Sequence, residues 1–288
     1  EITYTLDERP IANEFYTKTG IDQTAKTVIN KFGIPTETIQ VPVTKIWEDS
    51  NNKAGKRPEN IVLQIKDKKT GEVELEQLVQ GNKTTNDGWS YIFEVPKYNE
   101  TGEEVEYEIG ERNLNNKFYP EEVVEINQDS RTITNKFIVP DEKVAITVTK
   151  IWNDNNNSAR KRPDSVNFII TGNGKIYEQE LTKANASKDD TNKWVYTFNE
   201  LPKYDENGNE ITYTIDESDL NNKYYEKENV NQAEKTITNV SKYGKVTVHH
   251  YIEGTQTRVP DINGSEIADV IIEGVQGESY NTNTAENV

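Results

Sequence analysis

The sequence contains no cysteine, no methionine and only two histidines among its 288 residues. Without cysteine there is no disulfide, no thiolate metal site and no cysteine nucleophile. The chain therefore takes no stability from disulfide bonds, whatever compartment it occupies. The histidines are the neighbours His249 and His250, and in a strand their side chains would point to opposite faces. We expect no metal site and no cofactor.

Apolar residues and positive charge are also scarce. Hydrophobic residues make up 33% of the chain, and the formal net charge is −17. Such acidity argues against nucleic acid and anionic membrane surfaces as partners. No signal peptide and no apolar run of membrane-spanning length is present, so we expect no membrane insertion in this part of the protein. Glu1 stands within a repeated pattern in place of an initiator methionine, so we expect a piece of a longer chain.

Internal repeats organise the chain. The motif VTKIW occurs at 43–47 and 148–152, and its lysines, Lys45 and Lys150, are 105 residues apart. A PKY turn, a YxIxE run and a TITN run recur at nearly the same interval. We predict tandem domains at 40–138 and 143–241, preceded at 1–32 by the C-terminal remnant of a third copy. Residues 244–288 lack VTKIW and are predicted to begin a different, truncated small β-domain.

The repeats are predicted to be all-β. Short runs rich in Val, Ile, Thr, Tyr and Phe alternate with clusters of Asn, Asp, Gly and Pro, and no long stretch has a helical period. Six or seven strands in about 100 residues are typical of an immunoglobulin-like β-sandwich. The polar segments 48–55 and 153–157 lack the spacing of an EF-hand, so we interpret them as solvated turns. In the first complete repeat the expected strands are 42–47, 60–66, 72–78, 90–94, 104–111 and 131–136.

Three polar residues fall on strand faces that are otherwise apolar. Alternation places Lys45 on the face of Val43 and Trp47, and a lysine there needs a partner or a chemical role. The same reasoning places Glu111 and Asn135 on apolar faces, and the second repeat provides Lys150, Glu217 and Asn239. We expect the lysine on the first strand, the asparagine on the last and the glutamate on the strand before it. Burying these groups apart would be costly, so we expect them side by side.

Two interpretations of this cluster remain open from the residues alone. In one, lysine and glutamate form a buried ion pair that is hydrogen-bonded to the asparagine amide. In the other, burial lowers the pKa of the lysine and raises that of the carboxyl. The neutral amine then attacks the asparagine side-chain carbonyl, ammonia leaves, and an isopeptide bond forms. Because such a reaction consumes its own residues once, an enzyme with turnover is disfavoured.

The motifs VTKxW, KRP, PKY, YxIxE and ITN together resemble the collagen-adhesin B-type (CnaB) repeat of Gram-positive surface proteins. The resemblance implies inverse immunoglobulin-like sandwiches with autocatalytic Lys–Asn isopeptide bonds assisted by glutamate. It implies that Lys45 bonds Asn135 with help from Glu111, and that Lys150 bonds Asn239 with help from Glu217. In residues 1–32, Glu8 and Asn30 match the pattern, but the lysine is missing and no bond can form there.

The resemblance also implies a function. We expect a stalk segment of an extracellular, wall-anchored adhesin, whose partners would be host matrix or mucin glycans bound by other parts of the protein. The alternative is a ligand-binding adhesin module for a matrix protein or a mucin glycan, and the similarity between the repeats favours the stalk. The C-terminal stretches GKVTVHHYIEG and EGVQGESY resemble the start of a MucBP (mucin-binding) repeat. This implies association with mucins, although no binding residue is assigned.

Overall fold

The computed structural model describes residues 2–279, and nearly all of its regular structure is β. Two compact units are distinguished, one made largely of residues up to Pro140 and the other largely of residues from Asp141. Two short 3₁₀ helices, η1 (Glu121–Val123) and η2 (Lys183–Asn185), are the helical elements of the described residues. None of the helices among residues 2–279 has the length and hydropathy needed to span a membrane.

The first complete repeat is a two-sheet sandwich. One sheet has the order β6-β3-β9-β8 and the other β5-β4-β7. Their inward faces form one core, which includes Val43, Trp47, Ile65 and Ile133. The strands are β3 (Thr38–Glu48), β4 (Ile61–Asp67), β5 (Val73–Val79), β6 (Ser90–Pro96), β7 (Tyr107–Glu111), β8 (Glu125–Asn127) and β9 (Thr132–Lys136).

The second complete repeat has the same architecture. Its sheets have the orders β13-β10-β16-β15 and β12-β11-β14, and its core has equivalent members such as Val148, Trp152 and Ile237. The prediction of all-β tandem sandwiches is therefore confirmed. The strands are β10 (Lys143–Asn153), β11 (Ser165–Gly172), β12 (Lys175–Thr182), β13 (Lys193–Pro202), β14 (Thr214–Glu217), β15 (Tyr225–Asn231) and β16 (Thr236–Ser241).

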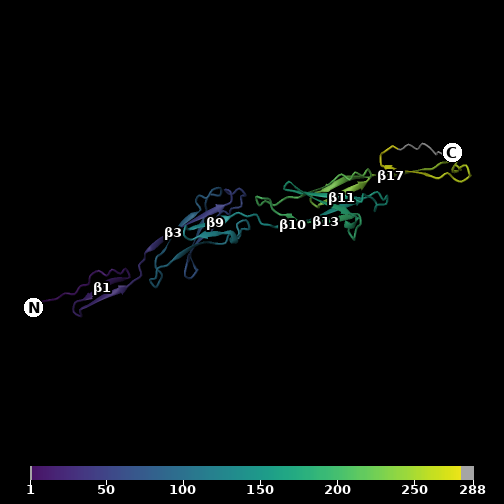
Figure 1. Cartoon of the computed structure of the whole chain (residues 1–288). Helices are drawn as coiled ribbons and strands as arrows, with labels where there is room; N and C mark the ends of the chain where they lie inside the picture. Colours follow the sequence, from purple (N-terminus) through teal and green to yellow (C-terminus); the bar gives the residue numbers. More distant parts are fainter. Residues whose placement is uncertain (1, 280–288) are drawn as a thin grey trace. The chain divides into compact units, whose positions relative to one another are not determined.

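The first and last strands of each repeat lie side by side. β3 pairs with β9 in parallel, with Lys45 opposite Ile133 and Trp47 opposite Asn135. Figure 1 shows β3 and β9 together in the first unit. β10 and β16 have the matching register, with Trp152 opposite Asn239. The lysine and asparagine of each repeat thus project from neighbouring strands into the same core.

The expected place of the glutamate strand was wrong. A further strand, β8 or β15, lies between the glutamate strand and the last strand in sequence. The glutamate strand also belongs to the other sheet, where β7 pairs with β4 and β14 pairs with β11. Alternation shows which way a side chain points but not which sheet its strand joins. The glutamate consequently faces the lysine and asparagine across the sandwich.

The two ends of the chain form smaller structures than the complete repeats. Residues Tyr16–Asp22 (β1) and Thr27–Phe32 (β2) form an antiparallel hairpin. YTLDE, at 4–8, is not a strand in the described structure, because no strand pairs with it there. At the C-terminal end, β17 (Tyr243–Val248) pairs with β18 (Val270–Val275). The predicted small domain at 244–288 includes residues 280–288, which lie outside the described residues.

Candidate crosslinking site in each repeat

Lys45, Glu111 and Asn135 meet in the core of the first repeat. Lys45 and Asn135 are fully buried, and the Glu111 side chain is 4% exposed. Asn135 Nδ2 donates to Glu111 Oε2 over 2.9 Å, and Lys45 Nζ lies 4.0 Å from the same oxygen. One carboxyl oxygen therefore faces both the amine and the amide.

An aromatic ring and backbone carbonyl groups surround the amine of this cluster. Lys45 Nζ lies 4.4 Å from the centre of the Trp47 ring and donates to the carbonyl oxygens of Ile46 and Ile133 over 3.1 and 3.4 Å. Burial lowers the pKa of Lys45 to about 7, although Glu111 opposes that shift. Burial also raises the pKa of Glu111. Both shifts favour the neutral forms of the two side chains, an amine and a carboxylic acid.

The second repeat brings Lys150 and Glu217 into contact, with Asn239 fully buried on the neighbouring strand β16. Lys150 Nζ lies 3.1 Å from Glu217 Oε2 and donates to Glu217 Oε1 over 3.4 Å. Burial lowers the pKa of Lys150 to about 8, with Glu217 opposing the shift. In the first repeat the carboxyl contacts the asparagine, whereas here it contacts the lysine. A glutamate at this position can therefore reach either partner, as a group that transfers protons between them must.

The asparagine amides are poorly satisfied. Among residues 2–279, Asn239 Oδ1 and Nδ2 have no hydrogen-bond partner, and neither has Asn135 Oδ1. An unpaired polar group in a dry core costs free energy, and an amide with two such atoms is unusual for a residue whose role is only structural. The unpaired carbonyl oxygen remains available to a protonated carboxyl group.

Residues 2–32 contain two members of the cluster, the glutamate and the asparagine. Asn30 Nδ2 donates to Glu8 Oε1 over 3.2 Å, although Tyr4 to Glu8 form no strand. Glu8 Oε2 and Asn30 Oδ1 have no hydrogen-bond partner among the described residues. The glutamate–asparagine contact thus occurs in this copy as it does in the first complete repeat.

A buried arginine–aspartate pair beside each site was missed by the sequence analysis. Arg57 Nε and Nη2 each donate to the Asp49 carboxylate over 2.6 Å, and Tyr119 Oη donates to it over 2.7 Å. The guanidinium lies 5.5 Å from the centre of the Trp47 ring, which is also the ring beside Lys45. The segment 48–55 is therefore not simply a solvated turn, because Asp49 is buried and binds a KRP arginine.

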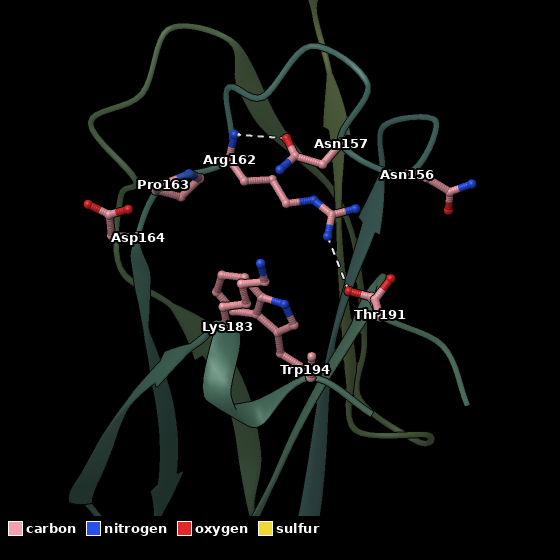
Figure 2. Close-up of a pocket in the computed structure, with 9 residues that line it drawn as sticks. Asn156, Asn157, Arg162, Pro163, Asp164, Lys183, Thr191 and Trp194 are labelled. Atoms are coloured by element: carbon pink, nitrogen blue, oxygen red, sulfur yellow. Dashed lines mark hydrogen bonds between the residues drawn. The ribbon is translucent and has the colours of Figure 1, made fainter. Parts of the chain in front are cut away.

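The second repeat repeats this pair. Arg162 donates to both carboxylate oxygens of Asp154 over 2.5 Å, and Tyr225 Oη donates to Asp154 over 2.8 Å. Figure 2 shows the Arg162 side chain donating to the backbone oxygen of Thr191, while its backbone nitrogen donates to Asn157. These residues line a hollow of about 410 Å³ whose wall includes Trp194. The signal for the pair was an Asp and an Arg eight residues apart in both copies.

No metal centre is formed in the described part of the chain. Residues 2–279 contain no group of three or more His, Asp or Glu side chains arranged to hold an ion.

Comparison with known proteins agrees with this arrangement of repeats. The family model for the Cna protein B-type domain matches residues 41–136 and 146–240. This chain belongs to the Cna protein B-type domain family. Each of its two B-type domains contains one complete Lys–Glu–Asn cluster, in the first at Lys45 and in the second at Lys150. The MucBP resemblance has no counterpart in this match.

The individual matches include an adhesin and the solved structure of a pilin. The collagen adhesin of Staphylococcus aureus is 30% identical over 224 residues, which are 75% of this chain and 16% of that protein. A solved single B repeat unit (B1) of the collagen binding surface protein of S. aureus is 30% identical, covers 71% of this chain and 99% of its own, and has a TM-score of 0.29. The shaft pilin SpaA of Lactobacillus rhamnosus GG is 13% identical, with coverages of 71% and 98% and a TM-score of 0.21. The chain thus spans about 16% of the length of the collagen adhesin.

Proposed function

We propose that this chain is a structural stalk segment of an adhesin, stiffened by an autocatalytic Lys–Asn isopeptide bond in each B-type domain. The observation that carries the proposal is the buried cluster itself, which recurs with the same three residue types. In both domains a lysine of lowered pKa lies beside a carboxyl group, and an asparagine with an unpaired amide oxygen is buried on the neighbouring strand. An ion pair alone would leave those amide atoms unsatisfied.

The reaction follows from these groups. In the first domain the neutral Lys45 Nζ attacks Asn135 Cγ, while protonated Glu111 donates a hydrogen bond to Asn135 Oδ1. Glu111 then accepts a proton from the attacking nitrogen and passes one to Nδ2, which leaves as ammonia. The N–C bond formed replaces the C–N bond broken, and no external reagent is needed. Proximity in a dry pocket lowers the barrier.

The position of the bond suits a stalk. It would join β3 to β9, the first and last strands of the domain, which run parallel as neighbours. Tension on the chain ends would then load the bond, and the roughly 90 residues between the joined positions would stay folded. By analogy with a disulfide that closes a loop of this size, the bond would stabilise the domain by about 4–5 kcal/mol.

The wider setting is part of the same proposal. A collagen adhesin is 30% identical over 75% of this chain, so we place the chain outside a Gram-positive cell, in a wall-anchored protein. Domains at 40–138 and 143–241 would act as spacers, with the end of another copy at 1–32. Binding to host matrix or mucin glycans would belong to other parts of the protein, and residues 244–288 would be the start of a MucBP-like repeat. The chain itself would not be a turnover enzyme.

Intact mass of the folded recombinant chain tests the proposal. We expect a deficit of two ammonia molecules, one for each complete domain. Glu111→Ala should reduce the deficit to one, because the first domain loses its proton-transfer group while the second still reacts. Glu108→Ala is the matched control, since Glu108 lies on the same strand with its side chain on the other face, and it should keep the deficit at two.

An intact mass without the ammonia deficit would refute the crosslinking. A full, unmodified mass from chain that circular dichroism shows to be folded would return both clusters to buried ion pairs. Binding of the chain to matrix proteins or mucin glycans in a screen would favour the adhesin-module alternative.

A further inference from the structure

The turn before the last strand of each copy carries a glutamine that contacts the glutamate segment. Gln128 lies between β8 and β9, and its side chain contacts the backbone of Ile109 on β7. Ile109 N donates to Gln128 Oε1 over 2.8 Å, and Gln128 Nε2 donates to Ile109 O over 3.0 Å. One amide side chain thus makes the two hydrogen bonds that a neighbouring strand would make.

The same contact occurs in the other two copies. Gln232 exchanges two hydrogen bonds of 2.7 Å with the backbone of Ile215. Gln23 exchanges two with the backbone of Leu6, over 2.7 and 2.6 Å. In each copy the contacted residue precedes the glutamate by two positions, which in strands β7 and β14 places both side chains on the same face.

A basic residue three positions after the glutamine adds a third bond. Arg131 Nη1 donates to the Tyr107 backbone oxygen over 2.8 Å. Lys235 and Lys26 donate through Nζ to the equivalent oxygens of Tyr213 and Tyr4. All three basic residues have a left-handed backbone, with φ of 55°, 56° and 56°. This conformation is uncommon outside glycine, so its recurrence with the same contact indicates a shared local requirement.

The contact matters because β7 is an edge strand. It pairs with β4 on one side, which leaves the N–H and C=O groups of Ile109 pointing outward on the other. The turn that supplies Gln128 leads directly into β9, the strand of Asn135. The three hydrogen bonds therefore connect the backbone of the glutamate strand in one sheet to the turn that leads into the asparagine strand of the other sheet.

Residues 2–32 show what these bonds do without a sandwich. Within the described structure, no strand pairs with residues 4–8. Gln23 and Lys26 nevertheless hold the backbone of Leu6 and Tyr4. Glu8 lies within hydrogen-bonding distance of Asn30, at 3.2 Å. The glutamate–asparagine contact thus accompanies the turn contact in a copy where sheet packing does not enforce it.

We propose that this glutamine and basic residue form a clamp that positions the assisting glutamate against the asparagine for crosslinking. The members are Gln128 with Arg131 in the first domain, Gln232 with Lys235 in the second, and Gln23 with Lys26 in residues 2–32. They are positioning residues, because they touch the backbone of the glutamate segment and none of the reacting atoms. The inference rests on the proposed crosslinking, which assigns the glutamate its role.

Gln128→Met in the full chain tests the clamp, since methionine keeps the length of the side chain and removes both hydrogen bonds. The chain is dissolved from inclusion bodies in urea and refolded by dilution, and the Lys45–Asn135 and Lys150–Asn239 crosslinks are timed by peptide mass mapping. Once tryptophan fluorescence shows the chain folded, the first crosslink should form about a hundredfold more slowly, as expected for a reacting group displaced by about 1 Å. The second crosslink and the Gln77→Met control, on strand β5, should react as in the original chain.

Gln128→Glu separates positioning from a loss of stability. A protonated carboxyl can both donate to Ile109 O and accept from Ile109 N, whereas a carboxylate can only accept. The rate of the first crosslink, taken as a ratio to the original chain at each pH, should therefore recover as the pH is lowered. A general loss of stability would not restore the rate of folded molecules in this way.

Three outcomes are distinguished. Equal crosslinking rates in folded Gln128→Met and the original chain would overturn the clamp and leave the proposed function intact. Absence of both crosslinks from the original chain would overturn the proposed function. The clamp is then still tested by amide hydrogen exchange of Ile109, which should be faster in Gln128→Met, and unchanged exchange would refute it.

Discussion

The pair of Asp49 and Arg57 offers a direct test of how the loop beside the site is held. Both side chains are fully buried, and the carboxylate accepts three hydrogen bonds from Arg57 and Tyr119. Asp49→Asn keeps the shape of the side chain but leaves the guanidinium without a buried counter-charge. Removing one partner of a buried ion pair costs about 3–5 kcal/mol. For a domain of roughly 100 residues this lowers the melting temperature by about 12 °C or more.

Calorimetry or urea denaturation of the full chain measures this effect, with the second domain as an internal reference. Asp49→Asn combined with Arg57→Met should recover most of the loss, because no unpaired charge then remains in the core. Glu59→Gln is the matched control, since Glu59 pairs with Lys83 at an exposed position and should cost at most about 1 kcal/mol. A loss of less than about 1 kcal/mol of stability in Asp49→Asn would refute the reasoning, because the pair would then contribute no more than an exposed ion pair does.

Two further predictions concern the pH dependence and the packing. In an uncrosslinked Asn135→Ala domain, the unfolded state binds more protons than the folded state between pH 7 and the ordinary lysine pKa, because folding lowers the pKa of Lys45 to about 7. The free energy of unfolding, measured in urea, should therefore rise by up to about 1.4 kcal/mol per pH unit from pH 7 to 9. The further substitution Lys45→Met should abolish this slope. A flat pH profile of the Asn135→Ala domain that still has Lys45 would contradict the lowered pKa. Gly172→Ala should lower the free energy of unfolding of the second domain alone by about 1–3 kcal/mol, because the added Cβ would lie 2.4 Å from the buried Tyr213 ring. An unchanged thermal transition of that domain would show that the ring can move aside.

The inward direction of the lysine and the asparagine could be predicted from the sequence because it depends on a period of two. Alternation placed Lys45 and Asn135 in the core, and the second copy repeated the pattern. The sheet to which the Glu111 strand belongs could not be predicted, since pairing is decided by long-range packing. Residues 4–8 carry a strand pattern but form no strand, because a strand needs a hydrogen-bonded neighbour and none is described there.

The arginine–aspartate pair and the glutamine contact were both missed for a local reason. The segment after Trp47 is rich in asparagine and looked solvated, yet Ser50, Asn51 and Asn52 all have a left-handed backbone. This turn folds the chain back so that Arg57 reaches Asp49. Similarly, the glutamine clamp was visible only as the recurring turn sequences NQDSRT, NQAEKT and DQTAKT. No propensity indicates that a turn side chain will replace a β-strand as a hydrogen-bonding partner.

The parallel register of β3 and β9 has a consequence for quality control. Trp47 lies opposite Asn135, and a slip of one residue would turn the asparagine away from the core. In the proposed reaction such a molecule would keep a free lysine and remain open to unfolding and proteolysis. The covalent bond would thus be present only in molecules whose first and last strands had paired in the correct register. A population of these chains exposed to proteases would then be enriched in correctly folded copies without any chaperone.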